Sequence, residues 1–250
     1  MIKSKKIMES SKIIHCFFNR ENGVSKGIYK SLNCGPGSKD NKKNILKNLS
    51  IVANKIGFKK KNLVLLKQIH SNKLFKINKL PKKKLIGDGL ITNVRKIALG
   101  ILTADCAPVF IYDKKKNKIG ALHAGWRGAF KKIVTKMLDH FIKSGSKIED
   151  LIAVVGPCIA QKHYEVKTDF KKKFLKQNNK NIRFFKIKRN KIYFDLGQYI
   201  YNQLVDYGLK NIDLIKKDTY TKNNNFFSAR RALKNKFNDY GRNLSVIMIK

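Results

Sequence analysis

Acidic residues are scarce in this chain, which has 16 Asp and Glu against 56 Lys and Arg and a formal net charge of +40. The four cysteines form no Cys-X-X-Cys pair, which argues against a disulfide-stapled fold and favours a reducing cytoplasm. No apolar run approaches the ~18 residues that cross a membrane. The N-terminal residues contain no apolar stretch of the kind found in signal peptides. We therefore expect a cytoplasmic protein without a membrane partner.

The excess of positive charge has two explanations. A basic field attracts nucleic acids of any sequence, so the chain could be a non-enzymatic nucleic-acid binder. The alternative is a compositional drift toward Lys, Asn and Ile. Lys outnumbers Arg, the better bidentate partner of phosphate, and the charge is scattered in short clusters such as Lys59–Lys61 and Lys171–Lys173. We therefore expect only electrostatic, salt-sensitive binding and no specific nucleic-acid partner.

The reactive side chains lie in one stretch in the middle of the chain. Two apolar runs, 97–102 and 108–112, flank a polar break that contains Cys106, and a third run, 119–122, leads to His123. Short apolar runs rich in β-branched residues predict buried strands. We expect these strands to bring the thiol and the imidazole to a common rim.

A Gly-X-X-Gly turn, Gly125–Gly128, follows directly. Apolar residues at helical spacing from Phe130 to Ile142 then predict a helix, which Gly145 ends. The backbone N–H groups of the turn would lie near the N-terminus of this helix, a favourable position for an anion such as phosphate. We predict that the turn and Arg127 help to hold phosphate.

A thiol and an imidazole at strand ends allow three interpretations. Both side chains could be ordinary buried residues. Cys106 and His123 could instead form a nucleophile–base pair, or they could be zinc ligands. Their spacing does not decide between these possibilities, but a third ligand would.

Other apolar runs predict the remaining elements. We expect strands at 13–18, 63–66, 90–92, 151–155, 212–215 and 244–249, and helices over 45–56 and 193–209. Asp40 is the expected cap of the first helix, and Gly57 its end. The chain shows no repeat, linker or change in composition. We therefore predict a single domain, residues 1–250, of the α+β or α/β class with mixed sheets.

Six motifs in a fixed order carry a family resemblance. They are Gln-Ile-His at 68–70, Gly-Asp-Gly at 87–89, Thr-Ala-Asp-Cys-Ala-Pro-Val at 103–109, His-Ala-Gly-Trp-Arg-Gly at 123–128, Gly-Pro-Cys-Ile at 156–159 and Phe-Phe-Ser-Ala-Arg-Arg at 226–231. Together they resemble the multicopper polyphenol oxidase, or laccase-like, family, whose members are also described as zinc-dependent purine nucleoside phosphorylases. The resemblance spans nearly the whole chain and implies a layered α-β-β-α sandwich.

The resemblance also implies a metal site and an activity. Its three zinc ligands correspond to His70, Cys106 and His123, and this set leaves a fourth tetrahedral position open for water or substrate. The implied reactions are phosphorolysis of adenosine, inosine, guanosine and methylthioadenosine, and deamination of adenosine. Copper is the alternative metal. A copper-dependent polyphenol oxidase, a Cys–His hydrolase that edits peptidoglycan precursors and a basic nucleic-acid binder stay open as alternative functions.

Further roles fall on residues of the same motifs. As catalytic and substrate-binding residues we predict Asp105, Cys106, Arg127, Asn33, Asp88 and Arg230. Asp105 precedes the Cys ligand, so on a strand its side chain would point to the opposite face. From there it would assist by hydrogen bonding or proton transfer. Asp88 lies between two glycines and would orient His70 or hold substrate, with a plain Asp-Gly turn as the alternative.

One position departs from the family's pattern. Many members carry Asn-Arg in the helix that precedes the Gln-X-His motif, and the matching pair here is Asn48-Leu49. A guanidinium forms forked hydrogen bonds to oxyanions, whereas Leu49 forms none. Lys67 and Arg230 are the candidate replacements. We therefore expect a high KM for phosphate, which Leu49→Arg would lower, and adenosine deamination that is less affected.

Overall fold

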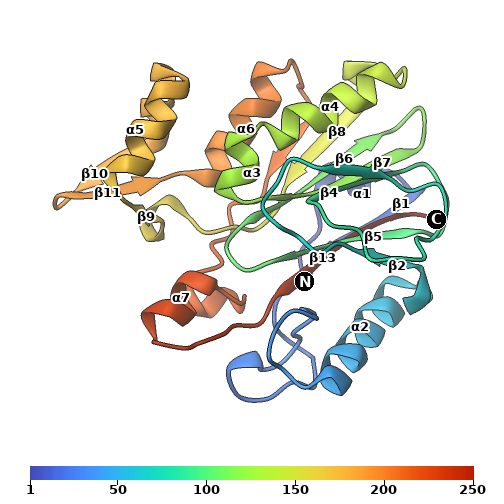
Figure 1. The fold of residues 1–250 in the computed structure, drawn as a ribbon. Helices are drawn as coiled ribbons and strands as arrows, with labels where there is room; N and C mark the ends of the chain where they lie inside the picture. Colours follow the sequence, from blue (N-terminus) through green and yellow to red (C-terminus); the bar gives the residue numbers. More distant parts are fainter.

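The computed structural model, which describes residues 1–250, has two β-sheets stacked face to face (Figure 1). The larger sheet has six strands in the order β12 (Ile212–Leu214), β8 (Leu151–Val155), β6 (Ala107–Asp113), β7 (Lys118–Ala124), β4 (Gly89–Thr92) and β3 (Leu74–Lys76). The smaller has four, in the order β1 (Ile13–Phe17), β13 (Asn243–Ile249), β5 (Ala98–Thr103) and β2 (Leu63–Leu65). Both sheets mix parallel and antiparallel pairs.

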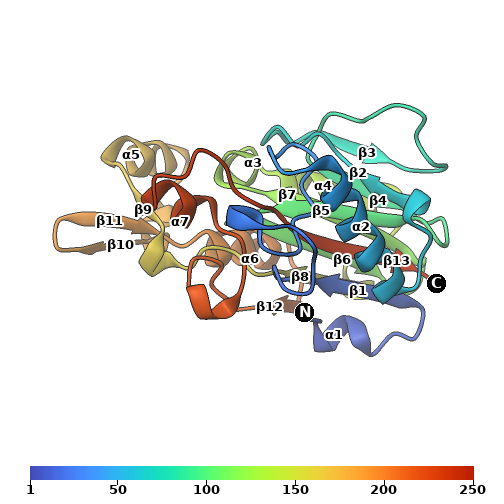
Figure 2. The same cartoon turned by 90° about the horizontal axis from the view of Figure 1, so that it is seen from below.

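Helices cover the outer side of each sheet. The α-helices are α1 (Lys5–Met8), α2 (Lys42–Ile56), α3 (Trp126–Phe130), α4 (Ile133–Lys143), α5 (Thr168–Gln177), α6 (Leu196–Asp206) and α7 (Ala229–Lys234). Helix α2 lies on the outer face of the four-stranded sheet, and α4 and α6 lie on the outer face of the six-stranded sheet (Figures 1 and 2). The expected α-β-β-α layering with mixed sheets is confirmed.

The apolar core has three layers. One lies between the two large sheets, one between the six-stranded sheet and its helices, and one between the four-stranded sheet and α2. Phe110 and Tyr112 of β6 pack between the sheets with Leu99 of β5, whereas Val109 and Ile111 face the layer formed with α4 and α6. A strand that is buried on both faces reads as a continuous apolar run, which is why the run at 108–112 is so uniform. Helix α2 forms the third layer against the four-stranded sheet.

A third, small sheet extends from this body. It consists of β10 (Phe185–Lys188), β11 (Lys191–Phe194) and β9 (Glu165–Val166). The hairpin of β10 and β11 projects beside α5 (Figures 1 and 2). The sequence analysis assigned no element to β9 or β10, although the alternation of Lys with apolar residues in β10 is a strand pattern. The helix expected over 193–209 begins only at Leu196, because Tyr193 and Phe194 belong to β11. None of the helices combines the length and the apolar character that crossing a bilayer requires.

Two local predictions are wrong. The helix expected from Phe130 to Ile142 is two helices, because Lys132 adopts a left-handed φ of 59° between α3 and α4. The cap of α2 is Asn41, whose side chain accepts a hydrogen bond from the Lys43 N–H. Asp40 instead accepts a hydrogen bond from the Ser25 hydroxyl.

Candidate metal centre

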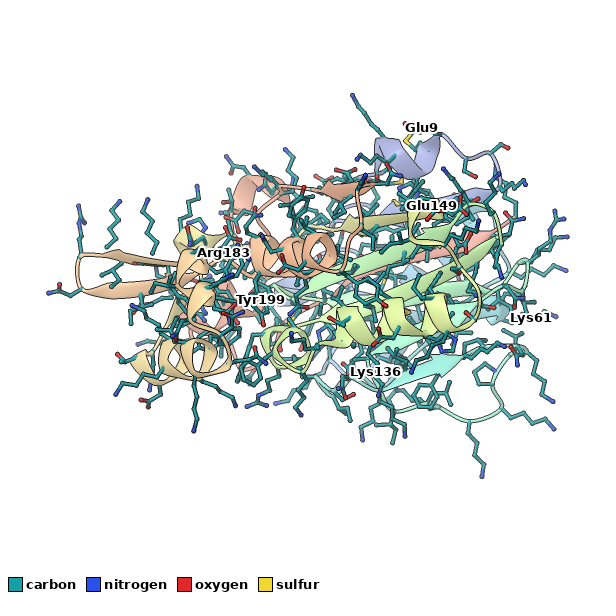
Figure 3. The ribbon with its side chains drawn as sticks, turned by 90° about the horizontal axis from the view of Figure 1, so that it is seen from above. Glu9, Lys61, Lys136, Glu149, Arg183 and Tyr199 are labelled. Atoms are coloured by element: carbon teal, nitrogen blue, oxygen red, sulfur yellow. The ribbon has the colours of Figure 1, made fainter.

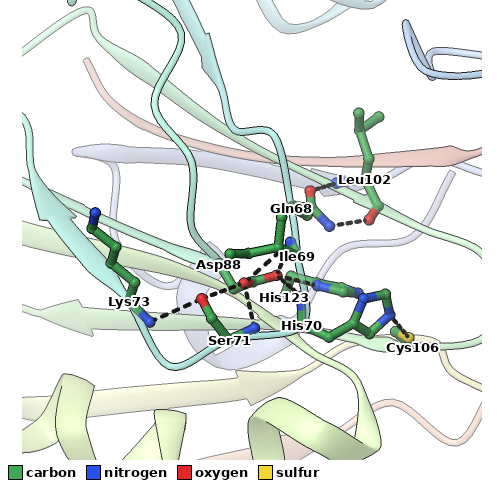
Figure 4. Close-up of polar contacts among 9 residues, drawn as sticks. All are labelled: Gln68, Ile69, His70, Ser71, Lys73, Asp88, Leu102, Cys106 and His123. Atoms are coloured by element: carbon green, nitrogen blue, oxygen red, sulfur yellow. Dashed lines mark hydrogen bonds and ion pairs between the residues drawn. The ribbon is translucent and has the colours of Figure 1, made fainter.

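Three side chains converge at one rim of the six-stranded sheet (Figure 4). His70, Cys106 and His123 each offer one ligand atom, and these atoms lie within 4.8 Å of one another. Cys106 Sγ lies 3.8 Å from His70 Nε2. The rings of His70 and His123 meet edge to face with centroids 4.7 Å apart. No other set of three His, Cys, Asp or Glu side chains in the structure forms such a group.

Strand register explains how the sequence forms this cluster. Cys106 immediately precedes β6, and Pro108 pairs with His123 of β7, so the thiol and the imidazole meet at one rim as predicted. His70 comes from the loop after β2 and adopts a left-handed φ of 58°. Such a φ is uncommon outside glycine, so the loop must be held in place by its surroundings.

Asp88 holds both imidazole-bearing segments. Its Oδ1 lies 2.8 Å from His123 Nδ1 and accepts a hydrogen bond from the His70 N–H at 3.0 Å. Its Oδ2 accepts from the backbone N–H and the hydroxyl of Ser71 at 2.6 and 2.7 Å. Because Nδ1 of His123 is bonded to Asp88, Nε2 is the nitrogen that remains for a metal ion. Asp88 therefore acts as the predicted orienting residue, and it holds His123 as well as the His70 loop.

Charges within the cluster shift its pKa values strongly. Burial raises the pKa of the Cys106 thiol, but the charge of His123 and hydrogen bonds with His123 and His70 outweigh burial and lower the pKa to about 6. Burial lowers the pKa of His123, but Cys106 and Asp88 raise it to about 9. Burial opposes ionisation of Asp88, yet hydrogen bonds from His123 and Ser71 lower its pKa to about 2. Without a metal the cluster thus favours a thiolate beside an imidazolium. The thiolate is the form that binds metal, and His123 would release a proton when a metal binds.

Gly125 leaves room for the cluster. A Cβ atom at this position would lie 2.8 Å from both Cys106 Sγ and His70 Cδ2. No real Cβ approaches a side chain so closely in a relaxed structure. The first glycine after the His-Ala pair is therefore required by contact with the ligands rather than by backbone conformation.

The cluster opens into a cationic cavity of about 320 Å³. Besides the three ligands, its lining includes Lys67, Lys84, Gln68, Tyr240 and Arg242. No acidic side chain lines it. We call it the ligand cavity.

A second cavity of about 660 Å³ begins at Trp126, one residue beyond Gly125. Aromatic rings of Trp126, Tyr164 and Phe170 line it. Basic side chains join them, among which Arg230 donates a hydrogen bond to the Glu165 carbonyl at 2.9 Å and lies over the Tyr164 ring. We call it the aromatic cavity. The three cluster residues line the ligand cavity but not the aromatic cavity, which is linked to them through Trp126 and the adjacent Gly125.

Asp105 does not face the cluster, contrary to the catalytic role predicted for it. Its buried carboxylate accepts hydrogen bonds from the Thr219 hydroxyl, the Ser228 hydroxyl and the Arg230 N–H at 2.7, 2.9 and 2.7 Å. These partners all lie in the segment that leads to α7. Its geometry is that of an anchor for the C-terminal segment, which places Arg230 at the aromatic cavity.

Arg127, like Asn33, Asp88 and Asp105, is a predicted site residue that lines neither cavity. Its exposed guanidinium lies over the Trp126 ring, 5.2 Å from the centroid. Trp126 to Gly128 of the expected turn lie within helix α3, which has only five residues. The predicted phosphate seat at Gly125–Gly128 therefore gains neither the guanidinium of Arg127 nor a long helix.

Asn33 does not line the ligand cavity but holds the backbone of Arg242, which does. It is fully buried, and its side-chain oxygen accepts hydrogen bonds from the backbone N–H groups of Gly35 and Arg242 at 3.0 and 2.9 Å. Arg242 lines the ligand cavity, although the sequence analysis assigned it no role. The signal for it was weak, a Gly-Arg pair just before the last strand.

The expectation for Leu49 is corrected by its surroundings. Asn48 is buried and ties α2 to the loop before it, accepting from the Val24 N–H and donating to the Asn33 carbonyl. Leu49 packs in the apolar layer beneath α2 and lines neither cavity. Leu49→Arg would bury a guanidinium among apolar side chains, so it offers no gain in phosphate binding.

Known proteins share this fold and this chain length. Residues 14–250 match the family described as multi-copper polyphenol oxidoreductase laccase. A purine nucleoside phosphorylase of Rickettsia prowazekii is 35% identical over 84% of this chain and 87% of its own. One of Bacteroides thetaiotaomicron is 33% identical over 100% and 96%. A crystal structure of a Bacillus licheniformis protein, 26% identical, superimposes with a TM-score of 0.88 over 95% of this chain and 93% of that one.

Proposed function

The chain belongs to the multi-copper polyphenol oxidoreductase laccase family, and we propose that it is a zinc-dependent purine nucleoside phosphorylase. The observation that carries this proposal is the His70, Cys106 and His123 cluster at a cationic cavity, with an aromatic cavity that begins at Trp126, one residue beyond Gly125. The relatives named purine nucleoside phosphorylase support it at 33–35% identity. The proposed substrates are adenosine, inosine, guanosine and methylthioadenosine, together with inorganic phosphate.

The cluster fits zinc by ligand type and spacing. Two imidazoles and one thiolate are a catalytic zinc set with one open position. Zinc–ligand bonds in tetrahedral geometry separate the ligand atoms by roughly 3.3–3.6 Å, and here all three atoms already lie within 4.8 Å. Zinc bound there would supply Lewis-acid polarisation at the reaction centre.

The protein's own side chains bind the two substrates, phosphate in one cavity and the purine in the other. In phosphorolysis a phosphate oxygen bonds to C1′ of the ribose, the bond from C1′ to the purine nitrogen breaks, and that nitrogen takes up a proton. Lys67, Lys84 and Arg242 supply the positive charge that holds phosphate in the ligand cavity. The rings of Trp126 and Phe170 offer stacking surfaces for the purine in the aromatic cavity.

Asp88 keeps His123 in the tautomer that leaves Nε2 free, and its buried position excludes water from that hydrogen bond. As a second activity of the same centre we propose the hydrolytic deamination of adenosine. In this reaction a water oxygen would bond to C6 of the purine, the bond from C6 to the exocyclic amino nitrogen would break, and that nitrogen would take up a proton and leave as ammonia.

Two other functions use the same residues differently. A multicopper oxidase needs several redox-active ions, whereas this chain has five histidines and one three-ligand cluster. Asp88, His123 and Cys106 also have the order of an orienting acid, a base and a nucleophile, as a Cys–His hydrolase would. That alternative gives no role to His70, which lies 3.8 Å from the thiol.

The test compares metal content with activity. We expect about one zinc per chain, with release of free purine from inosine that requires phosphate, and release of ammonia from adenosine. His70→Ala should lose both metal and activity. Activity that survives a chelator and is lost only on thiol alkylation would establish the hydrolase instead, and phenol oxidation by copper-loaded protein would establish the oxidase.

A further inference from the structure

A second cationic cavity, of about 470 Å³, lies at the opposite end of strand β7 from the metal cluster. Lys118 begins β7 and His123 lies five residues further on, which separates them by about 17 Å along an extended strand. The basic side chains that line the cavity are Lys76, Lys116, Lys118 and His140. Asn93 and Ser144 add polar groups, and no Asp or Glu is among the lining residues.

Lys118 is the unusual member of this group, because only 9% of it is exposed. Its side chain is on the face of β7 that α4 covers, and its ammonium lies over the Phe141 ring, 5.4 Å from the centroid. The ammonium donates one hydrogen bond, to the Ser144 hydroxyl at 2.6 Å. An ammonium carries three N–H donors, so two remain. Burying a charge with donors to spare costs free energy unless an anion compensates it.

One carboxylate lies near Lys118 but does not pair with it. Asp113 is opposite Lys118 in the β6–β7 register. Its Oδ1 accepts hydrogen bonds from the backbone N–H groups of Lys115 and Lys116, and its buried Oδ2 has no hydrogen-bond partner. Asp113 therefore offsets one positive charge at a distance and leaves the Lys118 ammonium directed toward Ser144.

The charges around the cavity do not cancel. Burial lowers the pKa of Lys118, and Lys116 and Lys76 lower it further, while Asp113 opposes them. Burial and the charges of Lys118 and Lys76 likewise lower the pKa of His140, which favours its neutral form. Three lysines against one aspartate leave a net charge of +2, with the imidazole as an additional hydrogen-bonding group.

We propose that this cavity binds a phosphate group, either free or carried by a nucleotide. The net charge of +2 matches a phosphate dianion, and lysine ammonium groups bind phosphate as point charges. The volume is in the range of cavities that hold whole small molecules, ~300–1,000 Å³, so a nucleoside monophosphate has room as well. This site is separate from the phosphate site of the proposed phosphorylase reaction and does not depend on it.

The experiment counts bound phosphate by equilibrium dialysis with radiolabelled inorganic phosphate in 150 mM NaCl. The salt suppresses binding to scattered surface lysines. Two variants remove the site, Lys118→Met at the buried position and Lys76→Met at an exposed one that does not threaten the fold. Lys136→Met is the matched control, since Lys136 is an exposed lysine of α4 outside the cavity (Figure 3).

We expect both variants to bind one phosphate fewer than the wild type, or to bind it at least tenfold more weakly, and Lys136→Met to behave as the wild type. Equal binding in the wild type and both variants would overturn the proposal. Phosphate bound at the metal centre is counted separately from phosphate in this cavity. If the proposed phosphorylase function is wrong, Lys118→Met should still bind one phosphate fewer than the wild type. Parallel titrations with adenosine monophosphate and adenosine distinguish a nucleotide site from a site for free phosphate.

Discussion

His123 and Asp88 form a fully enclosed pair, with Nδ1 and Oδ1 2.8 Å apart and exposed side-chain fractions of 4% and 0%. The pair exists because β4 and β7 are antiparallel neighbours with Gly89 opposite Leu122. Asp88 precedes Gly89 and His123 follows Leu122, so these two side chains meet at the rim of the sheet. The carboxylate also binds the backbone of the His70 loop, so one side chain fixes two of the three ligands.

Asp88→Asn should weaken metal binding by about 10–100-fold, the usual effect of removing a ligand's supporting carboxylate. The amide cannot accept from His123 and from the His70 loop as strongly as the carboxylate does. Zinc affinity measured by competition with a chromogenic chelator tests this. Asp206→Asn, at an exposed carboxylate of α6, is the control. Unchanged affinity in Asp88→Asn would show that the pair does not support the site.

Gly125→Ala should abolish metal binding while the fold is kept. The added methyl group would lie 2.8 Å from Cys106 Sγ and His70 Cδ2, so the ligands must move apart. Gly37→Ala is the control, since a Cβ there meets nothing within 4 Å. Metal content and circular dichroism of the two variants are the measurements. Full zinc occupancy in Gly125→Ala would contradict the observed geometry.

Substitutions in the two cavities should change the KM values of different substrates. Trp126→Ala should raise the KM for inosine by about fivefold, since a lost stacking surface costs about 1 kcal/mol, and should leave the KM for phosphate nearly unchanged. Arg242→Ala should do the reverse. Lys173→Ala, at the edge of the aromatic cavity, is a milder companion of Trp126→Ala. If both large effects fall on the same substrate, the division of the two cavities is wrong.

Asp105→Asn should lower stability rather than the chemical step. Three donors converge on the two oxygens of the buried carboxyl group, and an amide offers only one accepting oxygen, so the variant should lose about 1–3 kcal/mol of the free energy of unfolding. Burial raises the pKa of Asp105, so the lost hydrogen bonds rather than the lost charge set this cost. Urea unfolding and phosphorolysis at saturating substrate are the paired measurements. A stable variant with a kcat reduced by several orders of magnitude would restore the catalytic role first assigned to Asp105.

His15 should make the protein less stable in mild acid. It is buried and its Nε2 accepts the Ser4 N–H at 2.7 Å. Burial and the charge of Lys3 lower its pKa to about 4, against the opposing charge of Asp213. An unfolded chain protonates this histidine below its ordinary pKa near 6.5, whereas the folded chain stays neutral. Stability should therefore fall as pH drops from about 6.5 to about 4, by up to about 3 kcal/mol, with no contribution above that window.

The measurement for His15 is urea unfolding of the wild type and His15→Gln between pH 4 and 8. Glutamine can accept the same hydrogen bond but does not titrate. The wild type should lose stability relative to the variant as pH falls through this window. Parallel pH profiles for the two proteins would show that His15 does not titrate differently on folding.

The sequence by itself determined the elements that carry the metal ligands. Apolar runs on either side of Cys106 and before His123 predicted buried strands, and the resemblance of the motifs to a known family pointed to His70 as the third member of the cluster. Patterns of this kind are local, because strand burial leaves its mark on consecutive residues.

Only the tertiary structure decided what the side chains around the ligands face. Asp105 and Asp88 look alike in sequence, one beside Cys106 and the other in a glycine turn. Asp105, with a φ of 87° in the break between β5 and β6, faces the C-terminal segment, whereas the β4–β7 register brings Asp88 to His123. Arg127 precedes a glycine in the strongest motif, but it lies over Trp126 at the surface. Arg242 reaches the ligand cavity because β13 pairs with β5, more than a hundred residues away in the chain. Such contacts depend on pairing between distant segments, which no local pattern records.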